Sequence, residues 1–90
     1  MEPKFQPNQK VKVIPNPRVI NPGELTPGTI LIIKRNPFHP QRIFYTRRKI
    51  SFYSQEGEFL KEGFKNIYFV RQEDSNTYTW IPEDEIEEVK

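Results

Sequence analysis

The residues of this chain best suited to bind a partner lie between positions 42 and 53, where cations are interleaved with aromatic rings. Cations neutralise phosphates and ring faces stack on bases, so the segment could bind a nucleic acid. The same residue types could equally contact an acidic protein surface. The candidate contact residues of this segment are Arg42, Tyr45, Arg47, Arg48, Lys49 and Tyr53. The alternative is structural: Phe44, Phe52 and Tyr45 belong to the core, and the arginines keep an exposed edge soluble.

Strand alternation does not separate the aromatic side chains of this segment from the charged ones. It places Phe44 and Arg48 on one face, with Tyr45 and Arg47 on the other. A bulge or turn at residues 47–49 would gather three cations at a hairpin tip. We therefore expect either one long strand over 42–53 or a hairpin bent at 47–49.

Two further features could form a binding surface. Tyr68, Tyr78 and Trp80 lie on two segments joined by a short polar loop at 73–76, so their exposed face could hold a cationic side chain against aromatic rings. In so small a domain, however, Trp80 is more typical of the core. The proline-rich loop at 15–27, whose single cation is Arg18, is stiff and is the third candidate.

Residues for catalysis or metal binding are scarce. His39, the only histidine, is set between Phe38 and Pro40 in an expected turn, and nothing in the sequence supplies it with a nucleophile. The acidic residues at 83–88 lack the ligand spacing of a calcium loop and suit a solvated turn. The four glycines stand too far apart for a phosphate-binding loop. We expect a protein that is not an enzyme and that uses no cofactor or metal.

Length and composition indicate a single domain spanning residues 1–90, with residues 1–8 as a flexible N-terminal arm. The chain has no cysteine, which excludes disulfides and thiolate chemistry. The longest apolar run, residues 30–33, is far too short to span a membrane, and the N-terminus has no signal-peptide pattern. These features predict a cytoplasmic protein that does not insert in a membrane.

The net charge of +2 conceals an uneven distribution. Residues 1–50 contain ten Lys or Arg and two acidic residues, whereas residues 51–90 contain four and ten. This asymmetry could produce one basic and one acidic face, or the two halves could interleave within a barrel.

Apolar alternation and the turn residues predict a mostly β fold. We expect strands at residues 10–14, 29–35, 42–53, 66–72, 77–81 and 86–89, with turns at 55–57 and 83–85. Residues 58–65 fit a short strand or a single helical turn, and the pattern does not decide between them.

Three blocks of sequence frame these elements: Asn8–Ile14, Pro27–Ile33 and Tyr78–Val89. Together they resemble the framing of SH3-like small barrels, as found in the KOW, Tudor-like and photosystem I subunit IV families and in the variable subunit of ferredoxin–thioredoxin reductase. The resemblance implies a five-stranded, strongly bent sheet that acts as a binding module without catalysis, and for this chain we expect a five- or six-stranded small barrel. This chain departs from it in an extended loop at 15–27 and a longer insertion around 42–65.

The sequence thus leads to a first hypothesis: a non-catalytic protein–protein interaction module, an adaptor or accessory subunit, that docks a larger protein or complex through its basic–aromatic surface. The alternative is a nucleic-acid-binding barrel with Arg47, Arg48 and Lys49 on phosphates and Tyr45 or Tyr53 stacked on bases. A structural protein of a phage or mobile element is a third hypothesis, which composition neither supports nor excludes.

Overall fold

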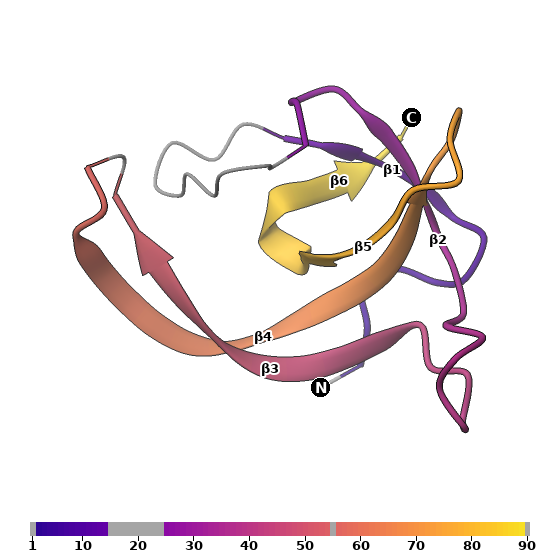
Figure 1. The fold of residues 1–90 in the computed structure, drawn as a ribbon, viewed down its shortest axis with the longest axis horizontal. Helices are drawn as coiled ribbons and strands as arrows, with labels where there is room; N and C mark the ends of the chain where they lie inside the picture. The colour runs from indigo at the N-terminus through magenta and orange to yellow at the C-terminus, as the bar shows by residue number, and fades with distance from the viewer. Residues whose placement is uncertain (1, 15–24, 55, 90) are drawn as a thin grey trace.

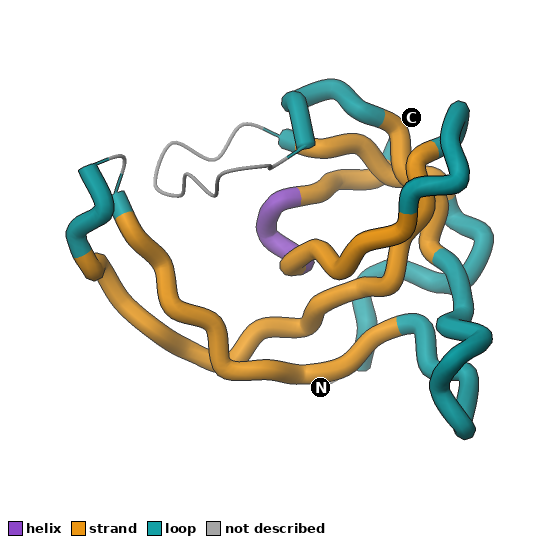
Figure 2. The backbone as a smooth tube through the Cα atoms, viewed as in Figure 1, coloured by secondary structure: helices purple, strands orange, loops and turns teal. Residues whose placement is uncertain are grey.

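The protein folds as one curled, half-barrel sheet of six antiparallel strands, as seen in a computed structural model that describes residues 2–14, 25–54 and 56–89 (Figures 1 and 2). The prediction of a mostly β fold is confirmed. The elements, in chain order, are β1 (Lys10–Val13), β2 (Ile30–Ile33), β3 (Tyr45–Tyr53), β4 (Phe59–Gln72), β5 (Tyr78–Pro82), the 3₁₀ turn η1 (Glu83–Glu85) and β6 (Ile86–Glu88). Most of the expected loop at 15–27, including Arg18, lies outside the described residues.

The long strand β4 connects the whole sheet. The strand order is β3-β4-β2-β1-β6, and β5 pairs with β4 as well. Strand β4 pairs with β3 from Phe59 to Tyr68 and, at its C-terminal end, with β2 from Val70 to Gln72. Strand β5 pairs with residues 67–71 of β4. A fourteen-residue strand therefore has three neighbours along its length.

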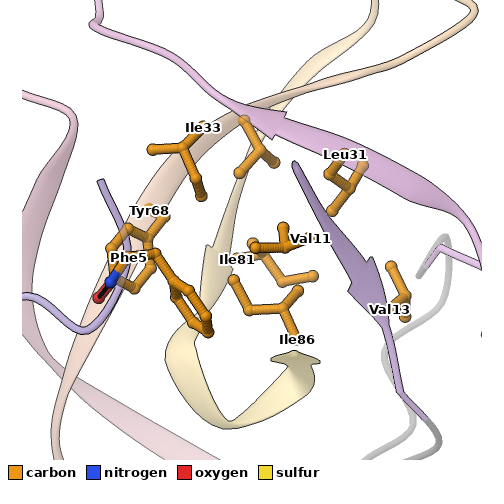
Figure 3. Close-up of a cluster of buried hydrophobic side chains, with 9 residues drawn as sticks. Phe5, Val11, Val13, Leu31, Ile33, Tyr68, Ile81 and Ile86 are labelled. Atoms are coloured by element: carbon orange, nitrogen blue, oxygen red, sulfur yellow. Dashed lines mark hydrogen bonds between the residues drawn. The ribbon is translucent and has the colours of Figure 1, made fainter. Parts of the chain in front are cut away.

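Alternation sets the inner face of the sheet, as the sequence indicates. In β1, Val11 and Val13 are buried, whereas Lys10 is exposed. In β2, Leu31 and Ile33 are fully buried, and neither Ile30 nor Ile32 is. Figure 3 shows these side chains pointing toward one another from several strands. The core consists of Phe5, Val11, Val13, Leu31, Ile33, Tyr68, Val70, Ile81 and Ile86.

The N-terminal segment, which we expected to form an arm, contributes one of the most buried side chains. Phe5 is 1% exposed, and its ring meets Tyr68 edge-on with centroids 5.4 Å apart (Figure 3). The backbone N–H groups of Lys4 and Phe5 both donate to the Tyr68 hydroxyl, at 2.9 and 3.4 Å. This segment therefore covers one end of the core.

The expected corner at the end of the chain is confirmed. Strand β5 ends at Pro82, a single 3₁₀ turn follows, and β6 returns to pair with β1, with Val13 opposite Ile86. Proline suits the end of a strand at the edge of a sheet because it has no N–H to donate. Two residues of the acidic 83–88 stretch, Glu83 and Glu85, are partly or fully buried, so only part of this stretch is a solvated turn.

Pairing of distant strands brings the basic and acidic halves of the sequence together. Lys10 lies 2.6 Å from Glu73 and Lys12 lies 3.2 Å from Glu87, measured between Nζ and carboxylate oxygens. Both pairs link the first half of the chain to the second. The halves therefore interleave in the described part of the sheet. Surface ion pairs of this kind stabilise a fold by less than about 1 kcal/mol each.

Candidate functional site: the β3–β4 ribbon

Strands β3 and β4 extend beyond the rest of the sheet as a curved two-stranded arm (Figure 1). From Asn66 back to Phe59, β4 has no described partner strand other than β3, because β5 pairs only from Ile67 onward. We call residues 47–66 the ribbon. Its tip is the turn between the two strands, where the Ser54 N–H donates to the Glu58 carbonyl at 2.8 Å.

The structure resolves both ambiguities that the sequence left here. Residues 59–65 are strand and not a helical turn, because they pair in register with β3. Strand β3 runs unbroken through residues 47–49, so the expectation of a hairpin bent at these cations is wrong. The only irregularity in the pairing is a shift between Phe52 and Tyr53. Arg47, Arg48 and Lys49 therefore lie side by side in the middle of the strand, far from the tip.

Most of the ribbon's cations have partners within the ribbon or beside it. An Arg47 Nη donates to the Asn66 amide oxygen at 3.3 Å, and Lys49 Nζ lies 3.0 Å from a Glu62 carboxylate oxygen. Lys65 Nζ lies 3.3 Å from Asp84 of η1. Arg48 is exposed and forms no ion pair with any described residue. Within the ribbon, Lys49 and Lys65 are therefore paired with carboxylates, whereas Arg47, Arg48 and Lys61 form no ion pair with a described residue.

Exposed apolar side chains gather on the same ribbon. Among the described residues, four of the seven exposed large hydrophobic side chains are Tyr53, Phe59, Leu60 and Phe64, with Phe64 61% exposed. Tyr53 and Phe59 meet edge-on near the tip, with ring centroids 6.0 Å apart. Exposed apolar groups that lie close together, rimmed by charges, mark sites of protein contact.

Phe52 is the apolar exception because it is buried within the ribbon. Lys61 Nζ and Lys65 Nζ lie 5.5 and 5.8 Å from its ring centroid. These contacts are within the range of cation–π attraction. The structural interpretation of the segment therefore holds for Phe52, and Phe44 and Tyr45 pack against the main core.

The remaining tyrosines do not form one surface. Tyr68 is fully buried and faces the core, opposite Ile81 of β5. Tyr78 and Trp80 lie on the other face, where Phe69 stacks on Tyr78 and meets Trp80 edge-on at 5.2 Å in each case. Trp80 is half-buried in this outer cluster. Tyr78 remains an exposed candidate, whereas the ring of Tyr68 is part of the core.

Tyr68 is held in a polar network at the base of the ribbon. Its hydroxyl donates to a Glu83 carboxylate oxygen at 2.5 Å, and the same oxygen accepts from the Asn66 amide at 3.3 Å. Burial, and after it the hydrogen bond to Glu83, raise the pKa of Tyr68 to about 12 against the opposing effect of the two backbone donors. The phenol is therefore protonated at neutral pH and acts as a structural cross-link.

The other residues considered from sequence are separate from the ribbon. Arg42 is exposed in the turn before β3, with a positive φ of 47°, and its carbonyl accepts from Arg35. His39 lies in the same turn, where its Nδ1 accepts from the Gln41 N–H at 3.1 Å. Within the described ranges, no three His, Asp or Glu side chains are placed to hold a metal ion. The same ranges contain no helix long and apolar enough to cross a membrane.

A surface hollow of about 490 Å³ lies elsewhere, between the N-terminal segment, β1 and β6, and sequence reasoning did not single it out. It is lined by Lys4, Phe5, Gln9, Lys12, Glu87 and Glu88. Its lysine and glutamate side chains partly neutralise one another, as in the Lys12–Glu87 pair. No convergent set of polar groups selects a ligand here.

Comparison of the chain with protein families, curated proteins and solved structures gave no match. The exposed ribbon residues that sequence reasoning did not select as candidates are Phe59, Leu60, Lys61 and Phe64. The available signal was the presence of two phenylalanines and two lysines, among acids, between residues 58 and 65.

The ribbon can be strengthened without changing its surface, because Gly63 sits in the middle of β4 where no special backbone is needed. A Cβ added there would meet no atom within 4 Å. We expect Gly63→Ala to raise the free energy of unfolding by about 0.5–1 kcal/mol, since glycine weakens a strand interior. Chemical denaturation would measure this. Gly57→Ala is the matched control: it has equal space but a φ of +86°, so it should destabilise. Equal changes in the free energy of unfolding would contradict the placement of Gly63 in a regular strand and of Gly57 at a positive φ.

Proposed function

We propose that this protein is an SH3-like barrel with one inserted strand. Without β3, the other five strands form the antiparallel path β5-β4-β2-β1-β6, with a one-turn corner between β5 and β6. Five strands in a strongly bent sheet are what the sequence resemblance implies. Strand β3 and the matching half of β4 then correspond to the insertion around 42–65. Small barrels of this kind commonly serve as scaffolds for recognition.

We further propose that the protein is a non-catalytic, cytoplasmic adaptor or accessory subunit that docks a larger protein through the ribbon. The observation that carries this proposal is the gathering of Tyr53, Phe59, Leu60 and Phe64, all exposed, on an arm that extends from the sheet. Aromatic side chains near the centre of an interface contribute much of the binding free energy. Arg48 adds a charge that can orient the partner.

The partners of the cations favour a protein over a nucleic acid. Binding to phosphates requires unpaired cations, yet Lys49, Lys65 and Arg47 already contact groups of this chain. An RNA or DNA would have to compete with Glu62 and Asp84 for the lysines. The nucleic-acid alternative remains a proposal that rests on the cations without an ion pair to a described residue, Arg47, Arg48 and Lys61, and on the exposed rings.

Substitution of the exposed rings tests the proposal. We expect Phe59→Ser with Phe64→Ser to weaken capture of the cognate partner at least about tenfold, because truncating aromatic anchors removes the main apolar contact. Phe38→Ser is the matched control, since Phe38 is 90% exposed but lies in the turn before β3. The measurement compares the amounts of each protein retained by the immobilised wild type, the double variant and the Phe38→Ser control.

Two results would contradict the proposal. Retention of the same partners by all variants would show that the ribbon rings are not a docking surface. The second result is binding of labelled single- or double-stranded DNA or RNA by the wild type that depends steeply on salt and is lost on Arg48→Ala. That outcome would promote the nucleic-acid function, because release of counterions makes phosphate binding weaken as salt rises.

A further inference from the structure

The outer edge of β3 has no strand beside it within the described residues. Strand β3 ends the sheet path and pairs only with β4. The Phe69 N–H donates to the Phe44 carbonyl at 2.9 Å, one step before the first pair of the register, Tyr45 opposite Tyr68. Hydrogen-bonded pairs alternate along an antiparallel ladder. The N–H and C=O groups of residues 46, 48, 50 and 52 therefore point to β4.

The intervening residues direct their backbone groups away from β4. These are Tyr45, Arg47, Lys49 and Ser51. No described residue outside β3 and β4 donates a hydrogen bond to them or accepts one from their backbone. Such a row of unsatisfied groups is a template for a further strand. The irregularity between Phe52 and Tyr53 ends this template near the ribbon tip.

The charge on this edge selects the strand that can be added. Arg47, Arg48 and Lys49 are consecutive and exposed at its centre, and among the described residues the one acidic side chain that pairs with them is Glu62, on Lys49. The hydrogen bond from Arg47 to the neutral Asn66 amide leaves the charge of Arg47 uncompensated. A second copy of β3 in antiparallel pairing would set these cations against one another, and like charges across a strand pair are destabilising. An extended segment with carboxylates at alternate positions would instead place acids beside Arg47 and Lys49, which share one face of β3.

The other open edge of the ribbon is unsuited to the same segment. This edge belongs to β4 and runs from Phe59 to Asn66, because β5 covers the same edge from Ile67 onward. At its end, Glu83 and Asp84 of η1 lie beside Asn66 and Lys65. Glu62 adds a third carboxylate on this strand. Lys61 and Lys65 offset these carboxylates, so an acidic segment would meet no net attraction here. The charge distribution therefore distinguishes the two edges.

We propose that the ribbon binds its partner by strand addition, with an extended acidic segment of the partner pairing along the free edge of β3. This inference rests on the proposed docking function and specifies its chemistry. Main-chain hydrogen bonds supply affinity in such complexes, and side chains on alternate positions supply specificity. Exposed rings of the ribbon would then contact the apolar side chains of the added strand.

Amide hydrogen exchange of the whole chain tests this directly. The probe is a capped synthetic peptide of alternating glutamate and valine, with a lysine-for-glutamate peptide as its control. At probe concentrations near 1 mM, we expect the amides of Tyr45, Arg47, Lys49 and Ser51 to gain at least about tenfold protection. The even-numbered amides, already paired with β4, should not gain. No protection at these four amides, or equal protection by the lysine peptide, would overturn the inference.

Two modifications separate strand addition from side-chain contact. In an added strand, every second backbone N–H of the probe points to β3 and the others point away. Methylation of the nitrogens that point to β3 should abolish binding, whereas methylation of the others should not affect it. Ser51→Pro, which removes an outward N–H at an edge position that tolerates proline, should weaken binding at least about tenfold. Equal effects of the two methylated probes would overturn strand addition, even with docking through Phe59 and Phe64 intact. Protection of the same four amides that rises with protein concentration in the absence of the probe would show that two copies of β3 pair with each other, and would overturn the proposed acidic segment.

Discussion

Phe5→Ala is expected to lower the free energy of unfolding by about 3–5 kcal/mol, the usual cost of truncating a buried phenylalanine. Phe5 is 1% exposed and packs edge-on against Tyr68, so its loss leaves a cavity beside the largest residue of the core. The stability of a domain this small is of the same order. Urea denaturation followed by tryptophan fluorescence would measure the change.

Phe38→Ala is the control for Phe5→Ala. It removes an identical side chain from a site that is 90% exposed, and it should change the free energy of unfolding by less than about 0.5 kcal/mol. Similar small effects at both positions would mean that the N-terminal segment does not cover the core in solution. The comparison therefore tests whether residues before β1 are part of the folded unit.

The second large effect concerns alkaline pH and Tyr68. Its folded-state pKa is raised from 10.0 to about 12, so the folded state holds the phenol proton more tightly than the unfolded chain does. This stabilisation is complete below pH 10 and is lost as pH rises from 10 towards 12. The loss should amount to roughly 2 kcal/mol across this window. Unfolding free energies measured at a series of pH values would show it.

Tyr68→Phe should remove this pH dependence. At neutral pH the variant should be less stable by about 1–3 kcal/mol, because Glu83 and two backbone N–H groups lose their partner. Between pH 10 and 12 its decline should be shallower than that of the wild type. Tyr78→Phe, at an exposed site on β5, is the matched control. Parallel declines of wild type and Tyr68→Phe would contradict the role given to Tyr68.

Alternation was enough to predict most strands of the barrel. Lys10–Val13 and Tyr78–Pro82 each have one buried and one wetter face, so period-two patterning identifies them. The sequence 58–65 was ambiguous because residues 59–62 are all exposed, so no buried position imposes a period on this part of β4. Only pairing with β3 makes these residues a strand.

The roles of individual aromatic residues were harder to predict. Residues 66–70 are all buried, and a run without alternation does not indicate which face meets the core. The inward position of Tyr68 is set by Phe5 and Glu83, which are 63 and 15 residues distant in sequence. Phe5 itself precedes the first strand and shows no periodicity. Contacts between distant segments, which a local pattern does not contain, decided these cases.

The position of β4 between β3 and the barrel also has a kinetic consequence. Tyr53 pairs with Phe59 across a short turn, whereas Val11 pairs with Glu88 across almost the whole chain. Hairpins form in about 1–10 μs, but contacts between distant residues must first overcome the entropy of closing a long loop. We therefore expect the ribbon to form early and the joining of β1 to β6 to limit the rate of folding. Substitutions at the ribbon tip should then alter the folding rate and leave the unfolding rate nearly unchanged, so changes in the surface proposed to recognise partners also change how fast the sheet assembles.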